Sequence, residues 1–262
     1  KRSGVAELIE FEIIRDKIPI FSVDASFMVT DEIGYIKVNR FAKTTMSEMY
    51  EAFEKLKKAG MKDLVLDLQG NGGGMLRTAT EMADTFLSDD KLIVYTEGRS
   101  FPRDDTFARI PGRFEKGRLV VLIDQGSASA SEIVSGAVQD WDRGLIVGRR
   151  SFGKGLVQRP VNLPDGSAVR LTVQKYYTPS GRCIQKPYED GVDAYRKEKF
   201  ERYESGELLS LDSLELPDSL KYETRLRGRT VYGGGGILPD VFVPLDTTDN
   251  SAYFSAILRK GL

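Results

Sequence analysis

The chain has 262 residues, of which 40% are apolar and 29% are charged, and its 38 basic and 39 acidic side chains leave a net charge of −1. This composition fits one large folded domain or a domain plus a fragment, and the balanced charge excludes a whole-chain basic surface for nucleic acid. No apolar run approaches the ~18 residues that a membrane-spanning helix requires.

The residue types that are missing restrict the chemistry further. The chain contains no histidine and a single cysteine, Cys183. These counts exclude Ser-His-Asp and Cys-His catalytic sites, histidine-ligated metals, an internal disulfide and cysteine-cluster metal centres. A hydrolase of this composition must take its general base from lysine, aspartate or glutamate, or from a metal-bound water that oxygen ligands hold.

Two kinds of hydrophobic period occur early in the chain. Apolar and other residues alternate at 8–15 and at 34–39, which predicts strands. Apolar residues at 44–59 recur with helical spacing, and Gly60 ends the predicted helix. From residue 63 onward short apolar runs alternate with helical segments, which predicts an α/β layered core. The expected strands of this core are 63–68, 92–96, 118–123 and 145–147, and its expected helices are 76–88 and 129–140.

A β-rich region follows this core. Strands are predicted at 156–162 and 168–177, joined by the turn signal Pro-Asp-Gly at 164–166. Residues 187–230 are charged and weakly patterned, and we interpret them as an insertion with some helix, or as a lid.

A glycine-rich run, GNGGG at 70–74, follows one predicted strand and precedes a helix, where backbone N–H groups can face an anion. A phosphate-binding loop is excluded, because no Gly-Lys-Ser/Thr follows and Met75 occupies the last glycine position of G-x-G-x-x-G. In isolation the run predicts a tight turn. Its functional alternative is an oxyanion hole, since glycine lets a backbone N–H approach developing negative charge.

A serine-rich turn, GSASASE at 126–132, follows another predicted strand and opens a helix. In isolation Ser129 and Glu132 form a capping box, a common start of a helix. The functional alternative is a nucleophile on a strand–turn–helix junction. In that case Ser129 is exposed and the N–H of Ala130 donates to the oxyanion.

The third motif places Lys154 between two glycines. In isolation this is a surface turn with a solvated lysine. In a chain without histidine, however, a neutral lysine is a known base for a serine nucleophile. Burial against apolar neighbours disfavours the charged amine. If residues 154–158 are extended, Gln158 shares a face with Lys154 and its uncharged amide can orient the amine.

In this combination and order, the three motifs resemble those of the carboxyl-terminal processing peptidases, also called tail-specific proteases. The resemblance covers nearly the whole chain. It rests on DLQGNGGG at 67–74, GSASASEI at 126–133, SFGKGLVQ at 151–158, YYTPSGR at 176–182, GILPD at 236–240 and RDKI at 15–18.

The resemblance implies a role for each motif. Ser129 would be the nucleophile, Lys154 the general base and Gln158 the group that orients the lysine. The N–H groups of Ala130 and of a glycine in the glycine-rich run, with Gly73 the expected one, would form the oxyanion hole. The family's usual Asn-Pro-Gly-Gly reads Asn-Gly-Gly-Gly here, so the choice among the three glycines stays open.

The resemblance also implies a fold, a substrate class and a location. The fold is a crotonase-like layered α/β core with a β-rich subdomain. Residues 1–18 would be the remnant of a PDZ domain, and 19–262 the peptidase core that contains the 187–230 insertion; Asp140 would be a structural aspartate. The expected substrates are unfolded or tailed polypeptides with exposed C-termini, cleaved near an apolar C-terminus. The expected location is extracytoplasmic, in the bacterial periplasm or cell envelope. No metal, other cofactor or nucleic-acid partner is implied, and a homo-oligomer is left open.

Two other functions fit the same fold class. One is a non-proteolytic binding protein for apolar ligands, and the other is an acyl-CoA-type enzyme whose oxyanion hole holds an enolate. Neither has a use for a serine paired with a lysine. The presence of Ser129, Lys154 and Gln158 in one chain therefore favours the peptidase.

Overall fold

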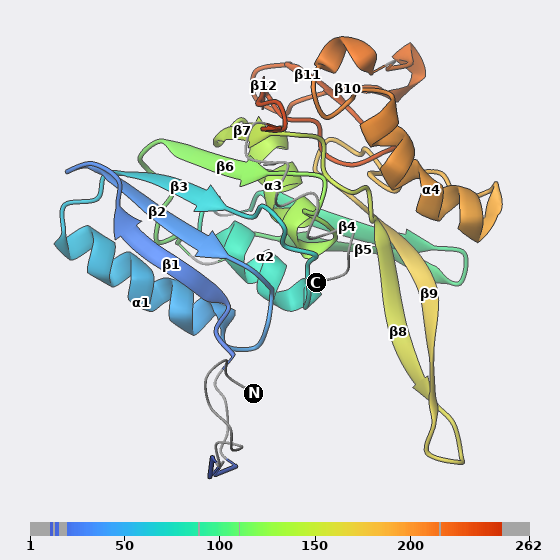
Figure 1. Ribbon diagram of the computed structural model, residues 1–262, viewed down its shortest axis with the longest axis horizontal. Helices are drawn as coiled ribbons and strands as arrows, with labels where there is room; N and C mark the ends of the chain where they lie inside the picture. Colours follow the sequence, from blue (N-terminus) through green and yellow to red (C-terminus); the bar gives the residue numbers. More distant parts are fainter. Residues whose placement is uncertain are drawn as a thin grey trace, which may run out of the picture.

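The centre of the molecule is a six-stranded sheet in the order β1-β2-β3-β6-β7-β12 (Figure 1). The computed structural model describes residues 11–12, 14–15, 20–88, 90–109, 111–214 and 216–247. β1 runs antiparallel to β2, and the other neighbours in this sheet are parallel. The strands are β1 (Val23–Met28), β2 (Ile33–Val38), β3 (Asp63–Asp67), β6 (Leu119–Ile123), β7 (Leu145–Gly148) and β12 (Val241–Phe242).

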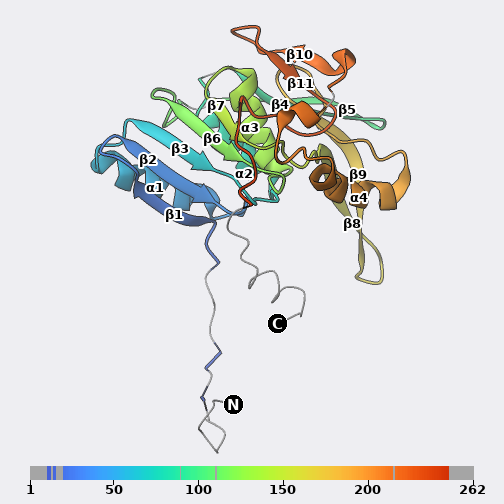
Figure 2. The same ribbon diagram turned by 45° about the horizontal axis from the view of Figure 1, so that its top comes forward.

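A second sheet has four antiparallel strands in the order β5-β4-β9-β8. It contains β4 (Leu92–Gly98), β5 (Phe101–Phe107), β8 (Leu156–Asn162) and β9 (Ala168–Tyr177). The β8–β9 hairpin extends away from the body of the molecule, and β8 forms the edge of its sheet (Figures 1 and 2).

Helices pack against both sheets. α1 (Thr45–Lys58) packs against β1 and β2, whereas α2 (Leu76–Asp84) and α3 (Ala130–Asp140) pack against each other and against β4. α3 also contacts β7, so α2 and α3 form a layer between the sheets. The helical spacing of Met46, Met49, Phe53 and Leu56 explains α1, because all four side chains are buried.

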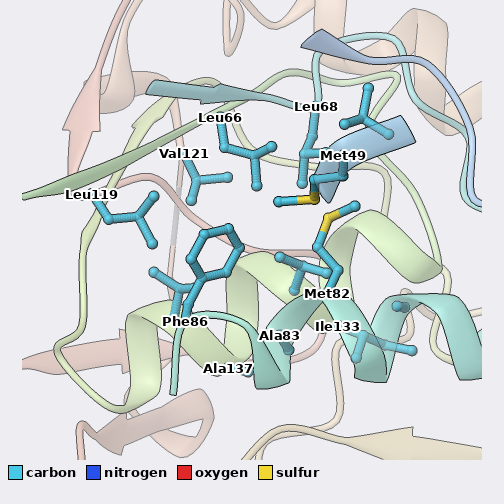
Figure 3. Packing of buried hydrophobic residues seen from close by; sticks show 14 of the residues in the cluster. Met49, Leu66, Leu68, Met82, Ala83, Phe86, Leu119, Val121, Ile133 and Ala137 are labelled. Carbon is cyan, nitrogen blue, oxygen red and sulfur yellow. The ribbon is translucent and has the colours of Figure 1, made fainter. Parts of the chain in front are cut away.

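The main core lies between the six-stranded sheet and the helices, as Figure 3 shows. Leu66 and Val121 point from the sheet toward Met82 and Phe86, and none of the four side chains is exposed. Burying a side chain of this size stabilises the fold by about 1.5–3 kcal/mol. This core fixes the carboxyl ends of β3 and β6, where the glycine-rich run and the serine turn begin.

The C-terminal part of the described chain adds short elements. These are α4 (Gly191–Glu204), two 3-10 turns at Leu211–Ser213 and Asp218–Leu220, and the hairpin of β10 (Lys221–Glu223) and β11 (Thr230–Tyr232). α4 lies near the base of the β8–β9 hairpin in both views (Figures 1 and 2). The region that we interpreted as an insertion thus contains one helix of more than three turns.

The structure confirms the predicted fold class, a layered α/β core with a β-rich subdomain. It adds five strands that were not predicted, namely β1, β5, β10, β11 and β12. The predicted helix 76–88 ends at Asp84, because Phe86 N–H bonds to Ala83 O three residues back and the chain turns there to bury Phe86 and Leu87.

The expected PDZ remnant lies mostly outside the described residues. Of residues 1–18 the structure describes 11, 12, 14 and 15, and these four are not in a strand. Within the described ranges, no helix is long and apolar enough to cross a membrane. The same part of the chain holds no group of three or more His, Cys, Asp or Glu side chains arranged to bind a metal ion.

Candidate active site

Ser129, Lys154 and Gln158 line one cleft with a volume of about 740 Å³. Ser129 is the N-cap of α3 just after β6, Lys154 lies between β7 and β8, and Gln158 is in β8. Ala130 and two residues of the glycine-rich run, Gly72 and Gly74, also line this cleft. The structure therefore brings three motifs that are far apart in the sequence to one place.

The backbone of Ser129 has a conformation that is rare for a residue with a side chain. Its φ is +56°, which costs roughly 1–3 kcal/mol and is typical of functional turns. Its N–H donates to Glu132 Oε2 at 2.7 Å, as the capping box predicts. Its carbonyl oxygen accepts from Tyr176 Oη at 3.0 Å. Hydrogen bonds thus hold both the backbone N–H and the carbonyl group of the serine.

The glycine-rich run packs directly on the serine turn. Gly73 has φ +100°, and a Cβ atom there would come within 2.8 Å of Ser129 Cβ and 2.7 Å of Ala128 O. Asn71 is fully buried and joins the two segments: its backbone oxygen accepts from Ala128 N–H at 3.0 Å and from Ser131 Oγ at 2.8 Å. Only glycine fits at position 73.

The backbone donors near the serine differ in how they are used. The N–H of Gly73 donates to Asn71 Oδ1 at 2.9 Å. Among the described residues, the N–H groups of Ala130, Gly72 and Gly74 donate to no group, and all three residues line the cleft. In this conformation, Gly72 and Gly74 have an unused N–H, whereas the N–H of Gly73 is occupied.

Glu132 connects the serine turn to the lysine loop. Its side chain is fully buried, and its carboxylate accepts four hydrogen bonds. Oε2 accepts from the N–H groups of Ser129 and Lys154, and Oε1 accepts from Gly153 N–H and Ser151 Oγ. Burial raises the pKa of Glu132, and the hydrogen bonds from residues 151, 153, 154 and 129 oppose this shift.

Tyr176 makes a second connection between the same two residues. Its ring is buried, and its hydroxyl contacts the backbone carbonyl oxygens of both Ser129 and Lys154. Burial also raises the pKa of this phenol well above its usual value, so it stays a hydrogen-bond donor. From the sequence alone, Glu132 has only a capping role and Tyr176 has no assigned role, because a local pattern does not show which distant loop packs on a residue.

The side chains of the proposed catalytic residues share the cleft without a hydrogen bond between them in the described part of the chain. Among the described residues, no hydrogen bond links Ser129 Oγ, Lys154 Nζ and the Gln158 amide. Ser129 and Lys154 are half-buried and Gln158 is exposed. Catalytic hydrogen bonds often form only when substrate is bound, so the shared cleft is the informative observation.

The walls of the cleft are apolar with basic groups. Met75, Leu76, Ile133, Leu156, Val157 and Pro160 supply apolar surface. Arg77, Lys154 and Arg170 supply the charges, and no aspartate or glutamate is among the lining residues. Such a cleft suits an extended peptide with apolar side chains and a nearby carboxylate.

Asp140 has the structural role that was expected of it. It forms an ion pair with Arg182 at 2.6 Å, and both side chains are completely buried. Its second oxygen accepts from Ser180 N–H at 2.8 Å. The YYTPSGR motif is therefore tied to the end of α3.

In this layered α/β fold, a serine on a strand–turn–helix junction and a lysine line the same cleft, in a chain that contains no histidine. The chain belongs to peptidase family S41, whose model matches residues 32–194.

The relatives found by sequence support this assignment. The chain is 40% identical over 191 residues to the carboxy-terminal-processing protease of Bartonella bacilliformis. The matched region covers 70% of this chain and 43% of the relative. It is 34% identical over 264 residues to the carboxy-terminal processing protease CtpB of Bacillus subtilis. That match covers 100% of this chain and 52% of the relative. The chain spans about half the length of these curated relatives.

Solved structures agree in fold. The photosystem II D1 C-terminal processing protease has a TM-score of 0.57 at 36% identity, over 65% of this chain and 47% of that one. A putative S41 protease from Bacteroides fragilis has a TM-score of 0.59 at 15% identity, over 94% of this chain and 59% of that one. The second likeness shows the fold alone.

Proposed function

We propose that this protein is a carboxyl-terminal processing endopeptidase that uses a Ser-Lys dyad. The observation that carries the proposal is that Ser129 and Lys154 line one cleft while Glu132 and Tyr176 hold both of their backbones. Two separate connections between a serine and a lysine fit a reacting pair better than a solvated surface lysine.

The proposed reaction is acyl transfer to serine. Neutral Lys154 takes the proton of Ser129 Oγ, and the oxygen attacks the peptide carbonyl. The N–H of Ala130 and a glycine N–H of residues 72–74 stabilise the oxyanion. The lysine ammonium then protonates the leaving amine, and water hydrolyses the acyl-enzyme. Gln158 orients the lysine amine.

The hydrogen bonds of the glycine-rich run bear on which glycine N–H donates to the oxyanion. Gly73, the residue expected from the sequence, would first have to release Asn71 Oδ1. Gly72 and Gly74 need no such change, because neither N–H has an acceptor among the described residues. We therefore propose that Gly72 or Gly74 donates in the conformation seen here, and that Gly73 donates only if the loop rotates.

The edge of β8 is the proposed binding site for the substrate backbone. β8 is the outer strand of its sheet, and Leu156, Val157, Gln158 and Pro160 line the cleft. An extended polypeptide can add to such an edge through main-chain hydrogen bonds, and apolar walls accept its side chains. We propose unfolded or tailed polypeptides with apolar C-termini as substrates. As the family resemblance implies, we also propose an extracytoplasmic location.

The test is cleavage of an unfolded polypeptide with an apolar C-terminus, with products read by mass spectrometry. The parent should release C-terminal fragments, and Ser129→Ala should release none. Ser47→Ala serves as the matched control, since Ser47 is exposed on α1 and bonds only to Thr44 O. Equal cleavage by the parent and Ser129→Ala would overturn the proposal.

A further inference from the structure

Helix α4 and the turn after it bury an unusual number of charges against the loop that carries Lys154. Arg202 and Glu207 are only 5% and 6% exposed, and Lys186, which contacts α4, is 3% exposed. Charged side chains are rarely buried to this extent unless they are paired. Their partners show what α4 holds in place.

Arg202 binds the loop backbone directly. Its Nη1 donates to Ser151 O at 3.0 Å and its Nη2 to Arg150 O at 2.7 Å. Its Nε donates to Glu207 Oε1 at 2.9 Å. A planar guanidinium that holds two consecutive carbonyl oxygens fixes the peptide between them in position and in orientation.

A second set of contacts joins the same loop to α4. Arg150 pairs with Glu207 at 2.6 Å and with Glu198 at 3.4 Å. Lys186 pairs with Glu198 at 2.7 Å, and its backbone N–H donates to Gly153 O at 3.0 Å. Residues on both sides of the loop are therefore attached to one helix and its following turn.

The loop passes this constraint on to the candidate active site. Ser151, whose carbonyl Arg202 binds, donates its Oγ to Glu132 at 2.5 Å. Glu132 in turn accepts from the N–H groups of Lys154 and Ser129. A continuous series of hydrogen bonds thus runs from α4 to the proposed dyad.

Stability alone does not explain the buried pair. Taking two charges out of water is unfavourable, and apolar side chains of similar volume often stabilise such a position as well or better. An apolar contact could not bind two carbonyl oxygens at fixed angles. The chemistry of the contact therefore points to positioning.

We propose that the Arg202–Glu207 pair is a positioning device for Lys154, which holds the 150–154 backbone so that the lysine amine can reach Ser129. The proposal rests on the proposed function, since it assigns the pair a role in that reaction. It gives the 187–230 region a role in catalysis without direct contact with substrate.

The first test compares four variants with the parent on the polypeptide substrate. Arg202→Met loses the donors, and the double variant R202M/E207L removes both charges of the pair while Arg150 keeps Glu198 as its partner. Arg196→Met is the matched control, because Arg196 is exposed on the same helix. Arg202→Met and R202M/E207L should each lower kcat by roughly 10- to 100-fold, the size of effect that a small misplacement of a catalytic group produces. Their KM should change less than about twofold. Arg202→Lys should recover only part of kcat, and Arg196→Met should match the parent.

The second test reads the loop itself. Amide hydrogen exchange at residues 150–155 should become faster in R202M/E207L than in Arg196→Met, while exchange in β3 and β6 stays unchanged. Parent-like kcat in a folded R202M/E207L protein would overturn the proposal. So would a loss of activity that appears in KM alone. If the parent does not cleave the substrate at all, the proposed function fails first, and the unaltered parent shows that failure separately.

Discussion

At the scale of single residues, the site depends on how closely two turns approach each other. Gly73 lies against Ser129 with no room for a side chain, whereas Gly72, one position earlier, has no atom within 4 Å of where a Cβ would be. The two neighbours offer a direct comparison, because both belong to the run that the sequence marked as a turn or an oxyanion hole.

Gly73→Ala should therefore damage the site and Gly72→Ala should not. The added methyl would collide with the serine turn and require a strained φ, at a cost of roughly 1–3 kcal/mol. We expect Gly73→Ala to lower the free energy of unfolding by this amount and to lower kcat severely. Urea unfolding and peptide cleavage measure the two effects. Equal behaviour of the two variants would contradict the described contact.

The candidate site could be predicted from the sequence only in part. The lack of histidine restricts the possible base, and together with the motif order it allowed Ser129 and Lys154 to be named as candidates. The buried links through Glu132, Tyr176 and Asn71 do not follow from it. Each depends on which distant loop packs on the residue, and such contacts leave no local pattern.

At the scale of elements, strands and helices with a clear period were predicted well. β8, β9 and α1 agree with their predicted ranges to within one residue. β1 and β5 were missed, since their burial patterns mix exposed and half-buried residues and show no regular alternation. α4 could not be located either, because its inward-facing side chains are charged and an apolar period is absent.

The attachment of α4 should depend on pH through Glu207. Burial alone would raise the pKa of Glu207, but hydrogen bonds and charges from Arg150 and Arg202 outweigh it and lower the pKa. A carboxyl with a lowered folded-state pKa contributes stability above its unfolded pKa of about 4.3 and loses it as the pH falls toward the folded value. The difference in free energy of unfolding between the parent and Glu207→Gln should therefore be largest above this pH and should shrink below it. Melting temperatures across this range measure it; a constant difference would contradict the ion-pair account.

The β8–β9 hairpin should contribute to substrate choice through charge. Arg170 lines the cleft, whereas Arg159 on the same hairpin lies against Phe101 and does not. Arg170→Glu should lower kcat/KM for a peptide with an aspartate near the cleavage point, relative to its asparagine counterpart, by roughly two- to fivefold, as for an exposed ion pair. Arg159→Glu should leave this ratio unchanged. If both variants shift the ratio equally, the cleft is not the source of the preference.

At the scale of the whole molecule, the two sheets and the helix layer between them bring distant motifs together. The glycine-rich run and the serine turn follow β3 and β6, which are parallel neighbours, so their loops meet at one edge of the six-stranded sheet. The lysine loop follows β7, the next strand in that sheet. The site is therefore a product of strand order, which explains why its residues are separated in sequence and adjacent in space.

The proposed activation of Ser129 by Lys154 can be tested by covalent labelling of the serine. A fluorophosphonate probe reacts with an activated serine, and peptide mass spectrometry identifies the labelled residue. The parent should be labelled at Ser129 at a rate that rises with pH. Lys154→Met should be labelled at least about 100-fold more slowly while remaining folded, because a general base contributes about 10²–10⁴ in rate. Labelling of Lys154→Met at the parent's rate, or labelling of the parent at another residue, would contradict the account.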